Sequence, residues 1–168
     1  MDNDELSSRH HPVEENMRMQ QRVWRFERLG WYALVVIVSL GLAGLFGNGP
    51  LSDGRSISAD GRVQVDYQRI SRSGTQDNLR ISVRGTPGTP VTVELDGGFF
   101  RHVSIQTLQP EPQVSRSRGQ ALLFELGTSA DGVATLYLTL HSESVGRLKG
   151  VVRSGPGSAA AFSTFFFP

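Results

Sequence analysis

The pattern of hydrophobic and polar positions divides the chain into two unlike parts, and the first centres on one apolar run. Residues 29–47 read LGWYALVVIVSLGLAGLFG and carry no charge. At 1.5 Å per residue a helix of this length is about 28 Å long, close to the hydrocarbon thickness of a bilayer. Ten of the nineteen residues are Leu, Ile, Val or Phe, which favours membrane insertion. We therefore predict a transmembrane helix over residues 29–47.

Two other structures compete for this run. A helix buried in a globular core normally keeps a polar stripe, and residues 29–47 have none. A cleavable signal peptide would also place positive charge before an apolar segment. However, the run is longer than the roughly 7–15 residues of a typical signal core, and no clear A-x-A site follows it. An uncleaved signal anchor is the preferred interpretation.

The orientation of the helix follows from the arginines on its two sides. Four precede it, Arg18, Arg22, Arg25 and Arg28, against Arg55 and Arg62 in the comparable stretch after it. Because positive residues stay on the cytoplasmic side, we expect the N-terminus inside and the C-terminal part periplasmic or otherwise extracytoplasmic. Arg25, Arg28, Trp31 and Tyr32 are the expected membrane-interface residues. The predicted location is the inner (cytoplasmic) membrane, in a single pass.

The segments around the helix have their own predicted roles. Residues 1–28 form a cytoplasmic tail, disordered at first and then a short helix, and residues 48–61 form a flexible tether rich in Gly and Ser. Within the apolar run Ser39, Ala43 and Gly47 repeat every four residues, so one helix face carries small side chains and could pack on another helix. Small residues are also common in any membrane helix.

Residues 62–168 show the period of β-strands. Apolar and polar side chains alternate in short runs that turn residues separate. The runs that we expect to be strands are 62–71, 78–84, 91–96, 99–108, 120–126, 133–141, 145–153 and 159–167. In the sixth of these runs Leu136, Leu138 and Leu140 should face inward, opposite Thr135, Tyr137, Thr139 and His141. The predicted fold is an all-β extracytoplasmic domain, an immunoglobulin-sized β-sandwich of seven or eight antiparallel strands, with a small barrel as the alternative.

Two further observations qualify this fold. The region has neither Cys nor Trp, so the markers of a true immunoglobulin domain are missing. The tetrapeptide Ser-Ala-Asp-Gly occurs at 58–61 and at 129–132, each time before a predicted strand. Little identity extends beyond it, so repeated turn chemistry explains it better than a duplicated domain.

The sequence contains no strong sign of catalysis. Cysteine is absent, and no nucleophile elbow, phosphate-binding glycine loop or zinc motif is present. His102 and His141 have no neighbours at metal-site spacing, and the acidic residues are scattered. We therefore expect no enzyme activity, metal or cofactor. The net charge of +1 argues against nucleic acid as a partner, and sixteen Arg against one Lys hints at a bacterial source.

Aromatic clusters in the β-region suggest contacts beyond its own core. Phe99, Phe100, Phe165, Phe166 and Phe167 place apolar side chains on both faces of their predicted strands, whereas a two-layer sandwich covers one face. Ordinary burial is one explanation, and contact with a partner or the membrane is the other.

The leading hypothesis for function is a single-pass membrane protein that acts as a non-enzymatic accessory or scaffold subunit. Its β-sandwich would dock on a membrane-protein partner or on a second copy of the chain. The alternative is a membrane-tethered ligand-binding or sensory module. Its tail is too short to be a signalling enzyme, so it would need a cytoplasmic partner.

Overall fold

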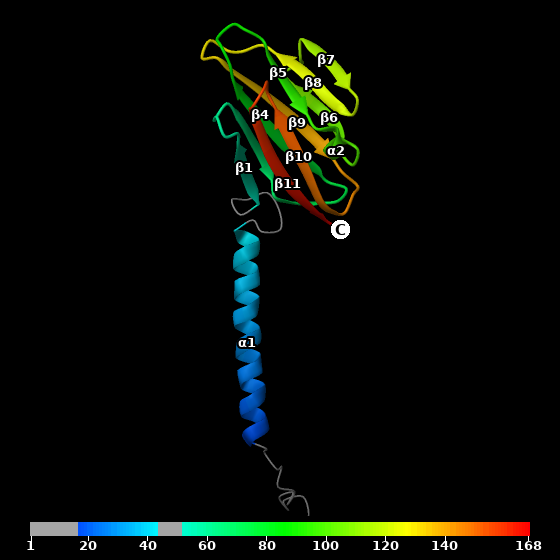
Figure 1. Ribbon diagram of the computed structural model, residues 1–168. Coiled ribbons are helices and arrows are strands. Elements are labelled where there is room, and N and C mark those ends of the chain that lie inside the picture. The colour runs from blue at the N-terminus through cyan, green and yellow to red at the C-terminus, as the bar shows by residue number, and fades with distance from the viewer. Residues whose placement is uncertain (1–16, 44–51) are drawn as a thin grey trace, which may run out of the picture. The chain divides into compact units, whose positions relative to one another are not determined.

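The structure, a computed structural model, describes residues 17–43 and 52–168. Helix α1 (Met17–Leu42) and the β-domain are separate units and are described separately (Figure 1). In α1 the guanidinium carbon of Arg28 lies 3.9 Å from the centre of the Trp24 ring, one helical turn earlier. The side chains of Trp31 and Tyr32 are exposed.

Within the described residues, no helix is both long enough and apolar enough to cross a membrane. The structure therefore does not support the transmembrane helix predicted over 29–47. Helix α1 begins at Met17 and carries charged residues as far as Arg28. Its uncharged part, residues 29–42, is only about 21 Å long. Residues 44–47, the end of the predicted segment, and residues 1–16 of the predicted tail lie outside the described residues.

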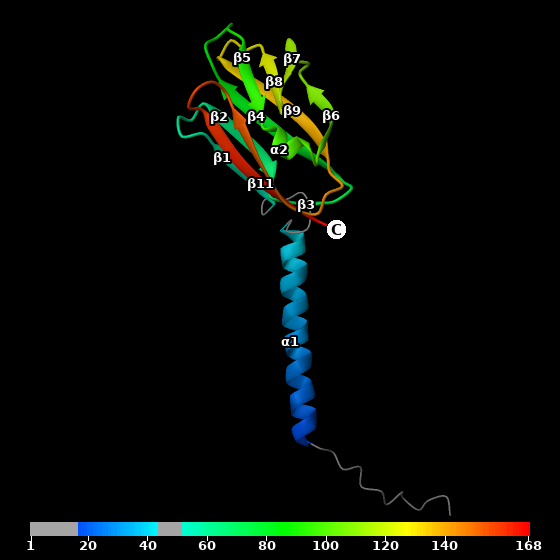
Figure 2. The ribbon, with the colours of Figure 1, turned by 45° about the vertical axis from the view of Figure 1, so that its right-hand side comes forward.

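The β-domain is a sandwich of two sheets, as the sequence predicted (Figure 1). The five-stranded sheet has the order β1-β2-β4-β9-β6, and Figure 2 shows both layers from another direction. Its strands are β1 (Asp53–Ile57), β2 (Val63–Gln68), β4 (Gln76–Arg84), β6 (Ser104–Gln109) and β9 (Val133–His141). The longest ladder, β4 against β9, runs antiparallel from Gln76 opposite His141 to Arg84 opposite Val133.

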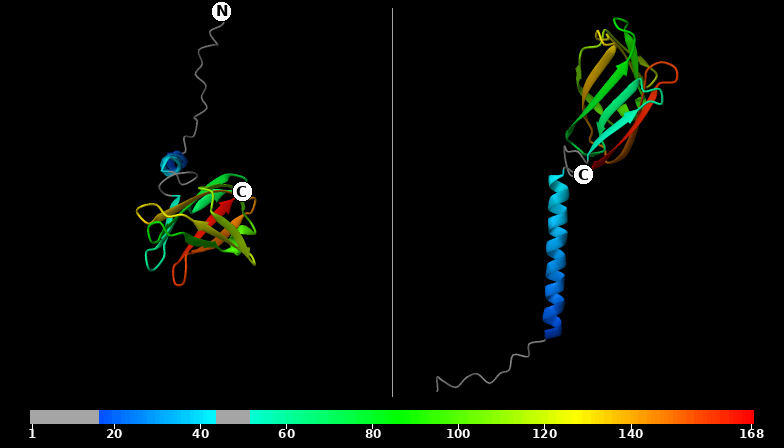
Figure 3. Two further views of the ribbon diagram at one scale, coloured as in Figure 1. Left: turned by 90° about the horizontal axis from the view of Figure 1, so that it is seen from above. Right: turned by 90° about the vertical axis from the view of Figure 1, so that its left-hand side faces the viewer.

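The second sheet has six strands in the order β3-β11-β10-β5-β8-β7. Its strands are β3 (Ile70–Arg72), β5 (Val91–Leu95), β7 (Val114–Arg118), β8 (Ala121–Leu126), β10 (Gly146–Arg153) and β11 (Ala159–Phe167). The described residues thus contain eleven strands rather than the predicted seven or eight. One pair, β3 with β11, is parallel, which the antiparallel prediction did not include. The two layers are also visible in Figure 3.

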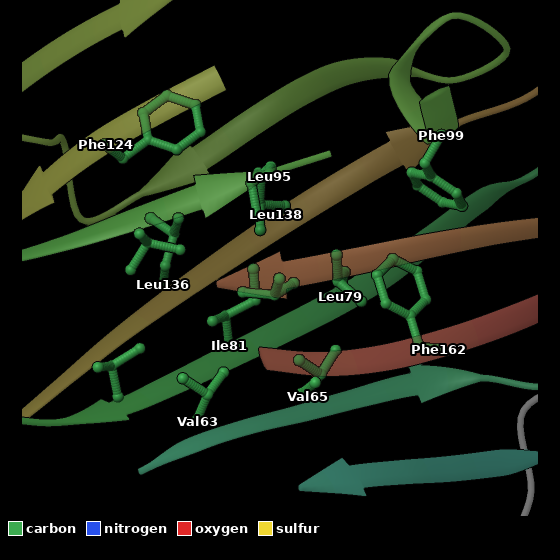
Figure 4. Packing of buried hydrophobic residues seen from close by; sticks show 14 of the residues in the cluster. Val63, Val65, Leu79, Ile81, Leu95, Phe99, Phe124, Leu136, Leu138 and Phe162 are labelled. Carbon is green, nitrogen blue, oxygen red and sulfur yellow. The ribbon is translucent and has the colours of Figure 1, made fainter. Parts of the chain in front are cut away.

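The core lies between the sheets and is built by alternate residues of each strand (Figure 4). Strands of the five-stranded sheet contribute a fully enclosed aliphatic layer, which includes Val63, Val65, Leu79, Ile81, Leu136 and Leu138. The six-stranded sheet faces this layer with Val93, Leu95, Phe124, Leu126, Val152 and Phe162. Leu136 and Leu138 point inward and Tyr137 outward, as the alternation predicted.

The predicted strand 99–108 is interrupted at its start. Residues Gly97–Phe100 form a short helix, α2, capped by the Asp96 carboxylate, which accepts a hydrogen bond from the Gly98 N–H at 3.3 Å. A Cβ on Gly97 would lie 1.8 Å from the carbonyl oxygen of Gln120, so only glycine fits there. The helix directs Phe99 into the core, where its ring centre lies 5.0 Å from that of Phe162. The strand itself, β6, begins at Ser104.

The predicted tether, 48–61, is largely part of the sandwich. Residues 48–51 lie outside the described residues, but Asp53–Ile57 form the edge strand β1, paired with β2. Ser52 is fully buried, and its hydroxyl donates to the carbonyl oxygen of Ile70 at 2.9 Å. The alternation of apolar side chains is weak in β1, so its sequence resembles a linker.

The two Ser-Ala-Asp-Gly segments form the same turn. In each, the serine N–H donates to the carbonyl oxygen of the first valine of the next strand, at 2.8 Å from Ser58 and 2.9 Å from Ser129. Each serine hydroxyl accepts the N–H of that valine. Gly61 and Gly132 have φ of 69° and 72°, the left-handed conformation that favours glycine. The two tetrapeptides therefore form like turns at the entrances of β2 and β9.

We predict that Phe162→Ala destabilises the β-domain by roughly 3–5 kcal/mol, because the ring is 5% exposed and deletion leaves a cavity. Phe165→Ala on the same strand is the matched control. Its ring is 44% exposed on the opposite face, so its cost should stay below about 1 kcal/mol. Urea unfolding followed by circular dichroism measures both. Equal losses would contradict the assignment of the two faces.

We also predict that Asp60 stabilises the fold in a pH-dependent manner. Hydrogen bonds from the hydroxyls of Ser158 and Ser58 lower its pKa from 3.8 to about 2. A lowered native pKa stabilises the protein above the unfolded-state value and is lost as the pH falls towards about 2. The stability difference between the wild type and Asp60→Asn should therefore be largest near neutrality and shrink below pH ~4.

The control for this prediction is Asp131→Asn in the second tetrapeptide. Within residues 52–168 no hydrogen bond reaches the Asp131 carboxylate, so this change should have little effect at any pH. Thermal unfolding between pH 2 and pH 7 distinguishes the two variants. A wild-type advantage over Asp60→Asn that grows on acidification would show that the assigned bonds are wrong.

Candidate functional site

The candidate site is the outer face of the five-stranded sheet. A hollow of about 680 Å³ lies there, lined by residues of β1, β2, β4, β6 and β9. Antiparallel registry aligns one outward residue from each of these strands: Arg55 opposite Asp66, Asp66 opposite Arg80, Arg80 opposite Tyr137 and Tyr137 opposite Gln109. These five side chains cross the floor of the hollow, and we call them the polar row.

One end of the polar row is held by an ion pair. The Nε of Arg55 donates to Oδ1 of Asp66 at 2.7 Å, and the Gln64 amide donates to both oxygens of the same carboxylate. Partial burial opposes ionisation of Asp66, but these bonds and the charges of Arg55 and Arg80 outweigh it, so its pKa lies below the usual value. Asp66 is therefore ionised at neutral pH and fixes Arg55 over the sheet.

The centre of the row is aromatic and cationic. The Tyr137 side chain is 52% exposed although it lies on β9, between β4 and β6. The guanidinium carbon of Arg80 lies 5.6 Å from the centre of its ring, within the range of a cation–π contact. Asn78 and Thr139 form the neighbouring row, where the Thr139 hydroxyl donates to the Asn78 amide oxygen at 3.5 Å. The hollow thus offers an aromatic face surrounded by amides, hydroxyls and guanidinium groups.

This arrangement suits binding better than acid–base catalysis. Among the described residues, no histidine lines the hollow, and its best-placed carboxylate, Asp66, is already paired with Arg55. A general acid would need a pKa near the working pH, whereas that of Asp66 is lowered. No group of three His, Cys, Asp or Glu side chains in residues 17–43 and 52–168 is arranged to hold a metal ion.

A second carboxylate, Asp77, is unusual but enclosed. It is 7% exposed; its Oδ1 accepts a hydrogen bond from the Ser71 hydroxyl, and its Oδ2 has no partner in the described chain. Burial raises its pKa, although the Ser71 bond and the charge of His141 act in the opposite direction. The adjoining void measures about 10 Å³, which admits a single water at most. Asp77 is therefore a structural group rather than a site for a substrate.

The aromatic residues predicted to contact a partner are divided by the structure. Phe99 and Phe166 are each 2% exposed, and Phe100 packs against the core, so these three serve the interior. Phe167 is half-buried, and Phe165 alone of the five has a largely exposed ring. The physical reason lies in α2 and in Gly150: α2 places Phe99 against Phe100 and Phe162, and glycine at 150 leaves room for the Phe162 ring.

The residues predicted on the helix belong to a unit separate from the β-domain. Arg25, Arg28, Trp31, Tyr32 and Ser39 lie on α1, with exposed side chains, and Ala43 follows its end. Gly47, the third member of the predicted packing face, lies outside the described residues. The predicted membrane-interface and helix-packing roles stay predictions.

The sequence did not single out the polar row as functional. Alternation placed Tyr137 on the solvent side of its strand among threonines, and an exposed aromatic side chain in a polar row is a usable signal. Strand order was the missing information. Arg55, Asp66, Arg80 and Gln109 are 28 to 82 residues away from Tyr137 along the chain, and sheet registry brings them together.

Comparisons with known proteins are sparse. No protein-family model and no curated protein matches the sequence. A cohesin module from the Clostridium perfringens ATCC13124 family 33 glycoside hydrolase is similar in structure, with a TM-score of 0.39 and 9% identity over 66% of this chain and 97% of that chain. A crystal structure of a complex of CaDoc0917 with CaCohA2 is similar with a TM-score of 0.36 and 10% sequence identity. The match covers 55% of this chain and 79% of that chain. These are loose likenesses of general shape, and the residues of the chain itself carry the functional interpretation.

Proposed function

We propose that the β-sandwich is a non-enzymatic docking module that binds a protein partner through the outer face of its five-stranded sheet. The observation that carries the proposal is the polar row: a half-exposed Tyr137 beside Arg80 in a hollow of about 680 Å³. Tyr and Arg are the side chains most enriched at energetic centres of protein interfaces. Both occupy interior strands, so their backbones are held rigidly.

The electrostatics of the row favour a partner with mixed polarity. Arg55 is paired with Asp66, whereas among residues 52–168 the Arg80 guanidinium is met by the Tyr137 ring and the more distant Asp66 charge and forms no ion pair. A carboxylate of the partner could pair with Arg80, while an apolar or planar group packs on Tyr137. Asn78, Thr139 and Gln109 would supply hydrogen bonds at the rim.

A small polar ligand is the second candidate. The volume of the hollow lies within the range of about 300–1,000 Å³ typical of ligand sites, and an aromatic face beside amides and hydroxyls suits a sugar ring. Thermal-shift measurements with a panel of neutral oligosaccharides would detect such a ligand. A shift abolished by Tyr137→Ala would favour this function over docking.

We further propose that the chain is anchored in the cell membrane with its N-terminus inside and the sandwich outside. The support is the sequence: nineteen uncharged residues at 29–47 follow four arginines, and four of the nineteen, 44–47, lie outside the described residues. In this arrangement the docking face would act on another membrane protein or a second copy of the chain.

We predict that the docking face forms specific crosslinks in intact cells. A photoreactive amino acid at Thr139, beside the polar row, should yield one discrete adduct. Mass spectrometry identifies the partner in this adduct. In the reciprocal experiment, purification of the tagged partner should also recover this chain. Adding Arg80→Ala should weaken the adduct roughly tenfold or more, the effect expected of a residue at an interface centre.

The matched control carries the photoreactive group at Ser163, on the outer face of the other sheet. It should not give the same adduct. Identical adducts from both positions, or insensitivity to Arg80→Ala, would refute a docking role for the polar row. Loss of folding is monitored by circular dichroism of each variant.

We predict that single-cysteine labelling will show the N-terminus inside the cell and the sandwich outside it. The chain contains no cysteine, so each introduced cysteine is the single site of labelling. In intact cells a membrane-impermeant maleimide should label Gln106→Cys on β6 and leave Ser7→Cys unlabelled until the cells are lysed. Both variants should stay with the membrane fraction after carbonate extraction. Release of the chain into the soluble fraction, or equal labelling of both positions, would contradict the anchor.

A further inference from the structure

The two outer faces of the sandwich differ strongly in charge. Residues 53–168 carry twelve basic and ten acidic side chains, a net charge of +2. The outer face of the six-stranded sheet alone has a larger positive charge than the whole of residues 53–168. Its outward positions hold six basic residues against Glu94 and Glu125, a net charge of +4, so the rest of the domain has a net charge of −2. The six are Arg72, Arg116, Arg118, Arg147, Lys149 and Arg153.

One end of this face combines basic and aromatic side chains. Registry places Arg147 of β10 opposite Phe165 of β11, and Phe165 opposite Ile70 of β3. On one side of this row, Phe167 lies opposite Arg72; on the other, Lys149 lies opposite Ser163. We call Ile70, Arg72, Arg147, Lys149, Phe165 and Phe167 the basic-aromatic patch. Figure 2 shows β3 beside the C-terminal end of β11, where the patch lies.

The three cations of the patch have no acidic partner among the described residues. Within residues 52–168, Arg72, Arg147 and Lys149 form no ion pair, whereas Arg153 further along β10 lies 3.6 Å from Glu94. Glu143, the acidic residue nearest along the chain, lies 3.9 Å from the imidazole of His141. Phe165 is 44% exposed at the centre of the patch. A surface with free cations around an exposed aromatic ring is suited to an anionic surface that also admits an apolar group.

The patch lies where the chain enters the domain. The buried Ser52 accepts the Arg69 N–H at its carbonyl oxygen, at 2.7 Å, and its hydroxyl donates to the carbonyl oxygen of Ile70, a patch residue. Only five residues, 48–52, separate Gly47 from the first strand. Fully extended they reach about 17 Å. If residues 29–47 cross the membrane, the patch is therefore held close to the lipid headgroups.

We propose that the basic-aromatic patch binds the headgroup layer of an anionic lipid bilayer, with Phe165 at the acyl boundary and Arg72, Arg147 and Lys149 on lipid phosphates. The inference rests on the proposed membrane anchor. Basic side chains near an anionic surface contribute about fivefold each in affinity, and aromatic rings favour the interface. Three cations bind weakly alone, but tethering makes the contact intramolecular and so raises its occupancy. Binding would orient the polar row away from the bilayer, towards a partner, since it lies on the opposite face of the sandwich.

The test uses the full chain with a single cysteine at Ser163, inside the face, labelled with an environment-sensitive nitrobenzoxadiazole dye. The protein is mixed with vesicles of phosphatidylcholine, or of phosphatidylcholine with phosphatidylglycerol, and association is measured by flotation. With the anionic lipid we expect a blue-shifted, brighter emission. The same dye at Ser82→Cys, on the outer face of the other sheet, should not respond.

Charge reversal separates this contact from general electrostatics. Arg147→Glu with Lys149→Glu should abolish the dye response at Ser163. The matched control, Arg62→Glu with Arg84→Glu, makes the same change of net charge at exposed positions outside the patch and should retain it. Phe165→Ser should reduce the blue shift. Equal loss in both double variants would overturn the proposal, because it would show that net charge alone governs the response.

Flotation distinguishes the failure of the patch from that of the anchor. If the protein floats with neutral vesicles but the dye does not respond to anionic lipid, the proposed role of the patch is wrong and the proposed anchor is supported. If the protein floats with anionic vesicles but not with neutral ones, and the dye responds to the anionic lipid, lipid binding by the patch is supported and the membrane anchor is refuted. Absence of both would overturn both proposals.

Discussion

The strict alternation of side chains along β4 and β9 is the constraint on which the rest of the structure depends. These strands pair over their whole length, so every inward residue, such as Ile81 or Leu136, enters the core, and every outward one is fixed by the same registry. A slip by one residue would place the leucines in water and Tyr137 in the interior. The energy that holds the core therefore also positions the polar row.

The glycines and caps around α2 show how the six-stranded sheet completes this core. Between β5 and β6, α2 inserts the buried ring of Phe99 against Phe162. Close approach is possible because Gly97 and Gly150 have no Cβ: one would strike a carbonyl oxygen and the other an aromatic ring. The contacts of Phe99 with Phe100 and Phe162 account for three of the aromatic rings that look surplus in the sequence, and Phe166 is buried, which leaves Phe165 and Phe167 on the outer face.

The sequence predicted the sandwich and most of its strands because long strands with one buried face carry a clear period of two. It missed β1 and β7, which are short edge strands with mostly exposed side chains, so burial imposed little pattern on them. It also extended a strand through α2, because Phe99 and Phe100 are strand-formers, whereas the close packing of Gly97 against Gln120 is distant in sequence and leaves no local pattern. Of the candidate site, alternation gave the outward direction of Tyr137. Its neighbours required the strand order, which local pattern does not contain.

Residues 53–57, which were predicted to be part of a linker, form strand β1, and this strand lies between residues that contact the two outer faces of the domain. Arg55 of β1 holds Asp66 and so forms one end of the polar row, while Ser52, just before β1, bonds to Ile70 at the edge of the basic-aromatic patch. The four residues 52–55 therefore contribute to both surfaces. Gly54 between them is buried, and a Cβ there would lie 2.7 Å from the Tyr67 ring, so any larger residue at this position would require the ring to move.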